Sequence, residues 1–93
     1  MEAILLEKSR TVVSETVFYE VVLWHLPEPV PGSRHFFKYR LALIVNGECV
    51  LRYDNERGKG DHRHIGEREE PIDFIDLGTL FDAFQADMER ILV

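Results

Sequence analysis

The alternation of apolar and polar side chains predicts a series of antiparallel β-strands over most of the chain. β-Branched and aromatic residues fill Thr16–His25, and every second residue of His35–Val45 is large and apolar. Asn46-Gly47 is typical of a type I′ hairpin turn, so we expect His35–Val45 to pair with a returning strand at Glu48–Asp54. Shorter strands are predicted at Glu2–Lys8, Val12–Val13 and Ile72–Phe74, with turns at Ser9–Thr11 and Ser14–Glu15.

A two-residue hairpin turn would also fix the register of the strands that it joins. Counting outward from Asn46-Gly47 pairs Val45 with Glu48 and Tyr39 with Asp54. In this register, each face of the hairpin mixes polar and apolar side chains away from the turn. We predict one face made of Tyr39, Leu43, Val50, Arg52 and Asp54, and an opposite face made of Lys38, Arg40, Cys49, Leu51 and Tyr53.

The apolar period changes after Phe74. From Leu77 onward, large apolar residues recur at three- and four-residue spacings, which is typical of an amphipathic helix, and Asp76 is the predicted N-cap. The predicted fold class is therefore α+β, an antiparallel β-meander sheet with the C-terminal helix packed on one face, in a single domain over residues 1–93. The apolar stripe consists of Leu77, Leu80, Phe81, Phe84, Met88 and Ile91.

The segment Leu26–Ser33 contains three prolines and is predicted to be a semi-rigid connection between strands. A proline-rich docking segment is the alternative interpretation.

The composition says more about the cellular compartment of the protein than about its activity. The chain has one cysteine, Cys49, which we expect to be a small core residue, so no disulfide forms within one chain. The apolar run near the N-terminus is four residues long, too short for a signal peptide or a membrane span. We therefore expect a cytoplasmic protein with no membrane association.

The net charge of −6 conceals an uneven distribution. Eight basic and five acidic residues lie between Arg34 and Arg68, whereas the rest of the chain has three basic and twelve acidic residues. A basic centre between acidic ends can still bind phosphate locally, because salt screens charges beyond roughly 8–10 Å.

Candidate chemistry is concentrated in Arg52–Gly66, which we expect to begin at a strand end and to continue as a loop. The backbone N–H groups of Gly58-Lys59-Gly60 could form an anion-binding nest, although the spacing is not that of a P-loop. The predicted phosphate or RNA ligands in and around this loop are Arg52, Gly58, Lys59, Gly60 and Arg63, with Lys38 and Arg40 at the same end of the predicted hairpin. A flexible loop whose acidic and basic residues neutralise one another is the alternative.

RNA cleavage is the reaction that these residue types favour. His62 and His64 could transfer protons, Arg57 could stabilise a phosphorane, and Asp54 or Tyr53 is a second candidate for proton transfer. In an extended segment, the two imidazoles would share a face with Arg63 pointing away, so that only one of them could reach the scissile group.

A metal site is an alternative. Asp61, His62 and His64 could bind zinc or manganese together with Asp54 or Glu56. No C-x-x-C or H-E-x-x-H spacing supports it, so we rank it below RNA chemistry and predict no cofactor.

The loop motif Tyr53–His64 resembles that of the TumE-type proteins, a group of small bacterial toxins from toxin–antitoxin pairs. Leu26–His35 and Phe37–Arg40 look like the same family, and the likeness extends over roughly Leu23–Phe84. The resemblance implies a helix-turn-helix antitoxin as partner and an activity against RNA or translation. It transfers no catalytic residues.

The sequence thus leaves three hypotheses. The first is a small α+β toxin that acts on RNA, for which ribonuclease activity is the enzyme activity to test. The second is a non-catalytic protein-interaction domain, which could also form a homodimer, using the Pro27–Pro31 loop and the helix. The third is a metal-dependent hydrolase.

Overall fold

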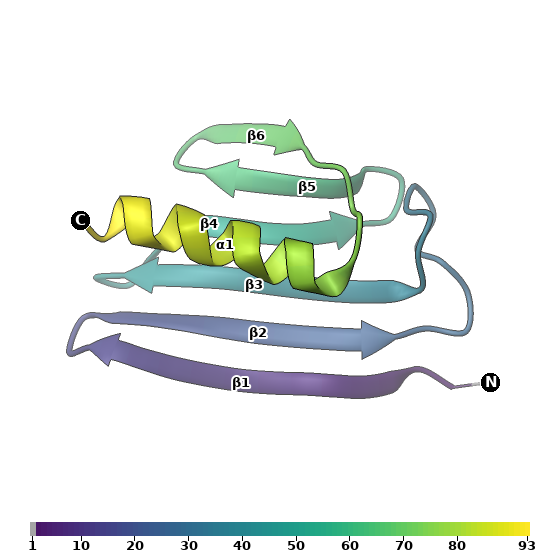
Figure 1. Cartoon of the computed structure of the whole chain (residues 1–93), viewed down its shortest axis with the longest axis horizontal. Helices are drawn as coiled ribbons and strands as arrows, with labels where there is room; N and C mark the ends of the chain where they lie inside the picture. The colour runs from purple at the N-terminus through teal and green to yellow at the C-terminus, as the bar shows by residue number, and fades with distance from the viewer. Residues whose placement is uncertain (1) are drawn as a thin grey trace.

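The computed structural model describes residues 2–93 and confirms the α+β class. Six antiparallel strands form one sheet in the order in which they occur in the chain, and a single helix lies across one face of it (Figure 1). Within the described residues, no helix is long and apolar enough to cross a membrane. The elements are β1 (Ile4–Ser14), β2 (Val17–His25), β3 (Phe37–Val45), β4 (Glu48–Glu56), β5 (Gly60–Ile65), β6 (Arg68–Pro71) and α1 (Leu77–Ile91).

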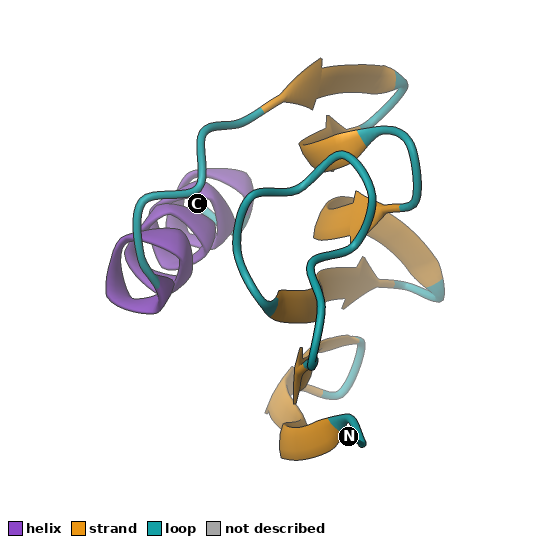
Figure 2. Ribbon diagram, turned by 90° about the vertical axis from the view of Figure 1, so that its right-hand side faces the viewer, coloured by secondary structure: helices purple, strands orange, loops and turns teal. Residues whose placement is uncertain are grey.

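The core lies between α1 and the middle of the sheet, as the apolar stripe of the helix predicts. Leu41, Leu43 and Leu51 are fully buried, and they form one cluster with Leu80 and Phe84 of α1. The side view shows the helix on one side of the sheet and, within residues 2–93, no helix or further strand on the other (Figure 2). We call these two sides the helix face and the open face.

The predicted N-cap of α1 is confirmed. The side chain of Asp76 accepts a hydrogen bond of 2.7 Å from the backbone N–H of Thr79. This bond stabilises the charged carboxylate and lowers the pKa of Asp76.

The predicted register of the β3–β4 hairpin is wrong, because a β-bulge follows the turn. Ile44 pairs with Cys49, but Leu43 pairs with Leu51, so Val50 has no partner in the ladder. Every pair beyond it shifts by one residue, and a shift of one residue moves side chains to the opposite face. The helix face therefore receives Tyr39, Leu41, Leu43, Leu51 and Tyr53, whereas Arg40, Ala42, Arg52 and Asp54 share the open face.

Four further predictions are corrected. Ser9–Thr11 is not a turn but part of β1, where polar residues are tolerated because the strand is exposed along its whole length. The loop predicted after Asp54 is mostly strand, since β5 pairs with β4. A strand forms at β6 rather than at Ile72–Phe74. Cys49 is exposed rather than in the core.

The turn between β4 and β5 packs closely against the proline-containing connection between β2 and β3. The backbone of Gly60 has φ +74°, and a Cβ atom there would lie 2.7 Å from the carbonyl oxygen of Gly32. Gly58 has a similar φ of +84°, but a Cβ atom there would meet nothing within 4 Å.

This difference gives a matched test of the packing. Gly58→Ala should lower the free energy of unfolding by about 1 kcal/mol, because only the left-handed backbone is strained. Gly60→Ala should lower it by roughly 3 kcal/mol, because the new methyl group also overlaps a backbone carbonyl. Urea denaturation followed by circular dichroism measures both values. Equal losses in the two variants would contradict the close approach of Gly60 to Gly32.

Candidate functional site

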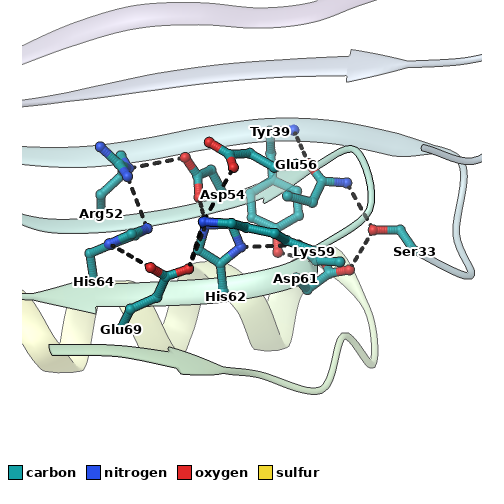
Figure 3. Close-up of polar contacts among 12 residues, drawn as sticks. Ser33, Tyr39, Arg52, Asp54, Glu56, Lys59, Asp61, His62, His64 and Glu69 are labelled. Carbon is teal, nitrogen blue, oxygen red and sulfur yellow. Dashed lines mark hydrogen bonds and ion pairs between the residues drawn. The ribbon is translucent and has the colours of Figure 1, made fainter. Parts of the chain in front are cut away.

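Polar side chains from three consecutive strands meet on the open face (Figure 3). Directly paired residues in antiparallel strands share a face. The ladder pairs Asp54 with His62 and Arg52 with His64, and it pairs His64 in turn with Glu69 of β6. The strand pairing therefore gathers these five side chains on the open face, and we call them the open-face cluster.

His62 is buried and held from both sides of its ring. Its Nδ1 lies 3.1 Å from the carbonyl oxygen of Gly60, so this nitrogen carries the proton and donates. Its Nε2 lies 2.7 Å from Oδ1 of Asp54. Both residues are more than nine-tenths buried, so the contact is shielded from water.

Arg52 connects Asp54 to His64. Its Nε lies 3.0 Å from Oδ2 of Asp54, and its Nη2 lies 2.9 Å from Nε2 of His64. A guanidinium can only donate hydrogen bonds, so Nε2 of His64 must accept. The ring proton of His64 then lies on Nδ1, and the imidazole is fixed in one tautomer with a lone pair on Nε2. The His64 side chain is 24% exposed, against 4% for His62.

Glu69 and Lys59 lie at the solvent side of this cluster. The Lys59 ammonium lies 3.3 Å from the Glu69 carboxylate, and its hydrogen bond lowers the pKa of Glu69. The carboxylate oxygens of Glu69 are 3.9 Å from Nε2 of His62 and 4.0 Å from Nδ1 of His64. A cavity of about 360 Å³ opens beside them, lined by Lys59, His62, Glu69, Glu70 and Pro71.

His62 and His64 share a face, as expected for an extended segment, and their ring centroids are 4.8 Å apart. Arg63 points to the helix face instead. There it forms an ion pair of 2.9 Å with Asp87 of α1 and a second one with Glu70. Arg63 therefore belongs to the packing of α1 against the sheet, and the structure separates it from the predicted phosphate ligands.

The predicted anion-binding nest is not formed in the β4–β5 turn. The N–H of Gly58 donates to the carbonyl oxygen of Pro31 at 2.7 Å, and the N–H of Lys59 donates to that of Glu56 at 3.0 Å. These two groups hold the turn closed and do not converge on a ligand. Arg57 is exposed at the tip of this turn.

Lys38 and Arg40 bring positive charge to the open face from β3. Arg40 is paired with Asp54 in the ladder, and Lys38 donates a hydrogen bond of 2.8 Å to the carbonyl oxygen of Asn55. Trp24 of β2 is the ladder partner of Lys38, so an aromatic ring lies on the same face. Sequence reasoning did not select Trp24 as a site residue, although its alternation within Thr16–His25 could have placed it there.

Asp61 does not join His62 and His64, because it points to the other side of β5. Its carboxylate accepts hydrogen bonds from Ser33 at 2.7 Å and Tyr39 at 2.6 Å, and it lies 2.7 Å from Nε2 of His35. Burial, reinforced by the Asp61 carboxylate, raises the pKa of Tyr39. The sequence-based ligand set Asp61, His62 and His64 is therefore wrong, whereas Asp54 does meet both histidines.

Glu69 is the other residue that sequence reasoning missed. A charged run such as Glu67–Glu70 is typical of a solvated turn, whereas in the structure a tight turn at Gly66-Glu67 returns the chain as β6. Gly66, which allows a tight turn between two short strands, was the available signal for such a hairpin.

The chain matches the family described as Toxin TumE over residues 2–92. The chain belongs to the TumE toxin family. No curated protein and no solved structure matches it. Membership of the TumE family makes the chain a toxin-family protein and suggests an antitoxin as partner, and it confirms the family that the loop motif resembles.

Proposed function

We propose that this TumE-family toxin acts on RNA in the cytoplasm and cleaves it by attack of a 2′-hydroxyl group on the adjacent phosphate. The observation that supports this proposal best is the contact between Arg52 and His64. It joins a guanidinium that can bind phosphate to an imidazole whose Nε2 lone pair becomes available for proton transfer once the guanidinium moves away.

Binding of a phosphate group to Arg52 would draw the guanidinium away from Nε2 of His64. The freed nitrogen would then accept the proton of the 2′-hydroxyl, whose oxygen attacks phosphorus. The bond from phosphorus to the 5′-oxygen breaks, that oxygen takes a proton from solvent, and a cyclic phosphate remains. Arg52 and Lys59 would neutralise the charge that develops on the phosphate oxygens.

Other residues have supporting roles in this proposal. The buried pair of Asp54 and His62 holds Arg52 in place and is too enclosed to transfer a proton directly. Lys38 and Arg40 extend the positive charge across the open face, where Trp24 offers a surface on which a base can stack. Arg57 is exposed at the turn and is retained as a phosphate contact.

Induction in bacteria tests the proposal. The wild-type chain should stop growth and fragment total RNA, and His64→Gln should do neither. His25→Gln is the matched control, because His25 is exposed at the end of β2, outside the open-face cluster. Growth arrest with intact RNA, or fragmentation by His64→Gln equal to wild type, would overturn the proposal.

We infer that the antitoxin, of the helix-turn-helix class that the resemblance implies, pairs with the free edge of β1. This strand is eleven residues long and exposed throughout, and it leaves Ile4, Leu6 and Val12 at least half exposed. An apolar groove of about 570 Å³ lies between β1, β2 and α1, lined in part by Val13 and Met88. An edge strand beside an apolar groove suits the addition of a strand from a partner.

A second copy of the chain is a poor partner for this edge in the register centred on Ser9. Antiparallel pairing of two β1 strands in that register would place Lys8 of each copy opposite Arg10 of the other, and directly opposed like charges are destabilising. An acidic segment of the antitoxin would instead complement these two charges.

Charge substitution at the edge tests this assignment. Val12→Glu/Val13→Glu should weaken co-purification with the antitoxin encoded beside the toxin by roughly tenfold, because two carboxylates would be buried. Ile75→Glu is the control, since Ile75 is equally exposed but lies far from β1 in the chain. Unchanged binding by the double variant would exclude the edge as the interface.

A further inference from the structure

Three metal-ligand side chains converge in the open-face cluster. One ligand atom from each of Asp54, His62 and His64 lies within 4.8 Å of the others. They come from adjacent strands whose pairing fixes their positions: His62 and His64 alternate along β5, and Asp54 is the ladder partner of His62. Two imidazoles and a carboxylate on rigid strands are a set of ligands suited to a transition metal.

Two of these ligand atoms are buried without a hydrogen bond. Oδ1 of Asp54 and Nε2 of His62 are 2.7 Å apart, yet neither makes a hydrogen bond within residues 2–93. Nδ1 of His62 donates to Gly60, so in the neutral imidazole Nε2 presents a lone pair to a carboxylate oxygen that also presents one. The two atoms then repel each other unless a positive centre lies between them, either a second ring proton or a metal ion.

We propose that Asp54, His62 and His64 form a binding site for a divalent transition metal of the zinc class. An ion in contact with Oδ1 of Asp54 and Nε2 of His62 would satisfy both buried atoms. The hydrogen bond from Nδ1 of His62 to a backbone carbonyl is the support that metal-binding histidines ordinarily have. Glu69, about 4 Å from both imidazoles, can supply a fourth ligand by a small movement of its exposed side chain.

The positive charge of Arg52 would repel a metal ion bound at this site. Its guanidinium donates to Nε2 of His64 and lies against the second oxygen of Asp54, so it is a positive charge at the edge of the proposed site. The Arg52 side chain is 30% exposed and can move into solvent. Removal of this charge should therefore tighten metal binding, a response that a random histidine pair on the surface would not show.

A metal ion on Nε2 of His64 would occupy the lone pair that the proposed cleavage uses, so the two proposals are tested separately, the metal site by binding alone without an RNA substrate. Isothermal titration of the full chain with ZnCl₂ should give one ion per chain, and MgCl₂ should give no binding, because imidazole ligands disfavour magnesium. At a zinc concentration about a hundred times the dissociation constant, the melting temperature should rise by roughly 10 °C.

Four variants make this test specific. Asp54→Asn and His64→Gln should weaken zinc binding by about a hundredfold, whereas Arg52→Ala should strengthen it. His25→Gln should bind zinc as the wild type does. Circular dichroism of each variant shows whether it is folded, and the exposed position of His64 makes His64→Gln the variant least prone to unfold. Zinc affinity unchanged by His64→Gln, or equally reduced by His25→Gln, would overturn the proposal.

Discussion

Substituting glutamine for His64 is expected to lower the cleavage rate of a single-stranded RNA by a factor of roughly 10² to 10⁴, the usual contribution of one positioned proton-transfer group. The glutamine side chain can still accept a hydrogen bond from Arg52, but its amide cannot take up a proton at neutral pH. The loss should therefore appear in the rate constant more than in RNA binding. Single-turnover cleavage of a fluorescent oligonucleotide by the purified protein separates these two quantities.

Two controls define what this loss would mean. An oligonucleotide with a 2′-deoxyribose at the cleavage position should remain intact with the wild-type protein, since the attacking hydroxyl is absent. Arg52→Ala should weaken RNA binding as well as the rate, and the weakening should be smaller at high salt because a phosphate contact has been removed. Cleavage of the 2′-deoxy substrate would mean that the reaction does not use the 2′-hydroxyl.

Replacing Asp87 with asparagine is expected to lower the free energy of unfolding by about 3 kcal/mol. Asp87 is 3% exposed and accepts hydrogen bonds from Tyr53 and Arg63 of the sheet and from Arg90 of its own helix. Asparagine would remove the buried carboxylate that pairs with Arg63 and leave only the more exposed Glu70 as its opposite charge. Equilibrium unfolding in urea at pH 7 measures the loss.

The Asp87 contacts also predict how this loss depends on pH. Burial disfavours the charged form of Asp87, but the hydrogen bonds from Tyr53, Arg63 and Arg90 outweigh it and lower its pKa. A group whose pKa is lowered by folding stabilises the protein above its ordinary pKa and loses this contribution as pH falls toward the folded value. The difference between wild type and Asp87→Asn should therefore be full at pH 7 and narrow below the ordinary pKa of an aspartate.

Arg90→Ala serves as the matched control for the same cluster. Arg90 is 74% exposed, so its ion pair with Asp87 is screened by solvent and its removal should cost less than about 1 kcal/mol. An equal loss in Arg90→Ala and Asp87→Asn would show that the buried contacts to the sheet contribute little.

Local patterns were sufficient to predict much of the fold. The period of Leu77–Ile91 and the cap at Asp76 predicted α1, and Asn46-Gly47 predicted the central hairpin. The bulge at Val50 could not be read from the sequence, because it depends on which side chains α1 covers rather than on the turn itself. Because of this one unpaired residue, one face of the hairpin is apolar and the other is polar.

The candidate site was predicted only in part. Alternation along β5 predicted that His62 and His64 share one face and that Arg63 lies on the other. This prediction depends on one strand alone and not on its neighbours. The partners of these histidines depend on the pairing of β5 with its neighbours. Asp54 was therefore one of several candidate acids, and Glu69 was missed because a charged run beside glycine is typical of a solvated turn.

The members of the open-face cluster all come from the stretch 52–71, which folds back on itself through two tight turns. Contacts between neighbouring hairpins close short loops, so this part of the sheet can assemble early and with little entropic cost. The stretch 52–71 therefore forms a nearly self-contained structural unit. Substitutions in β1 and β2, which contribute none of these side chains, should therefore leave the geometry of the open-face cluster unaltered.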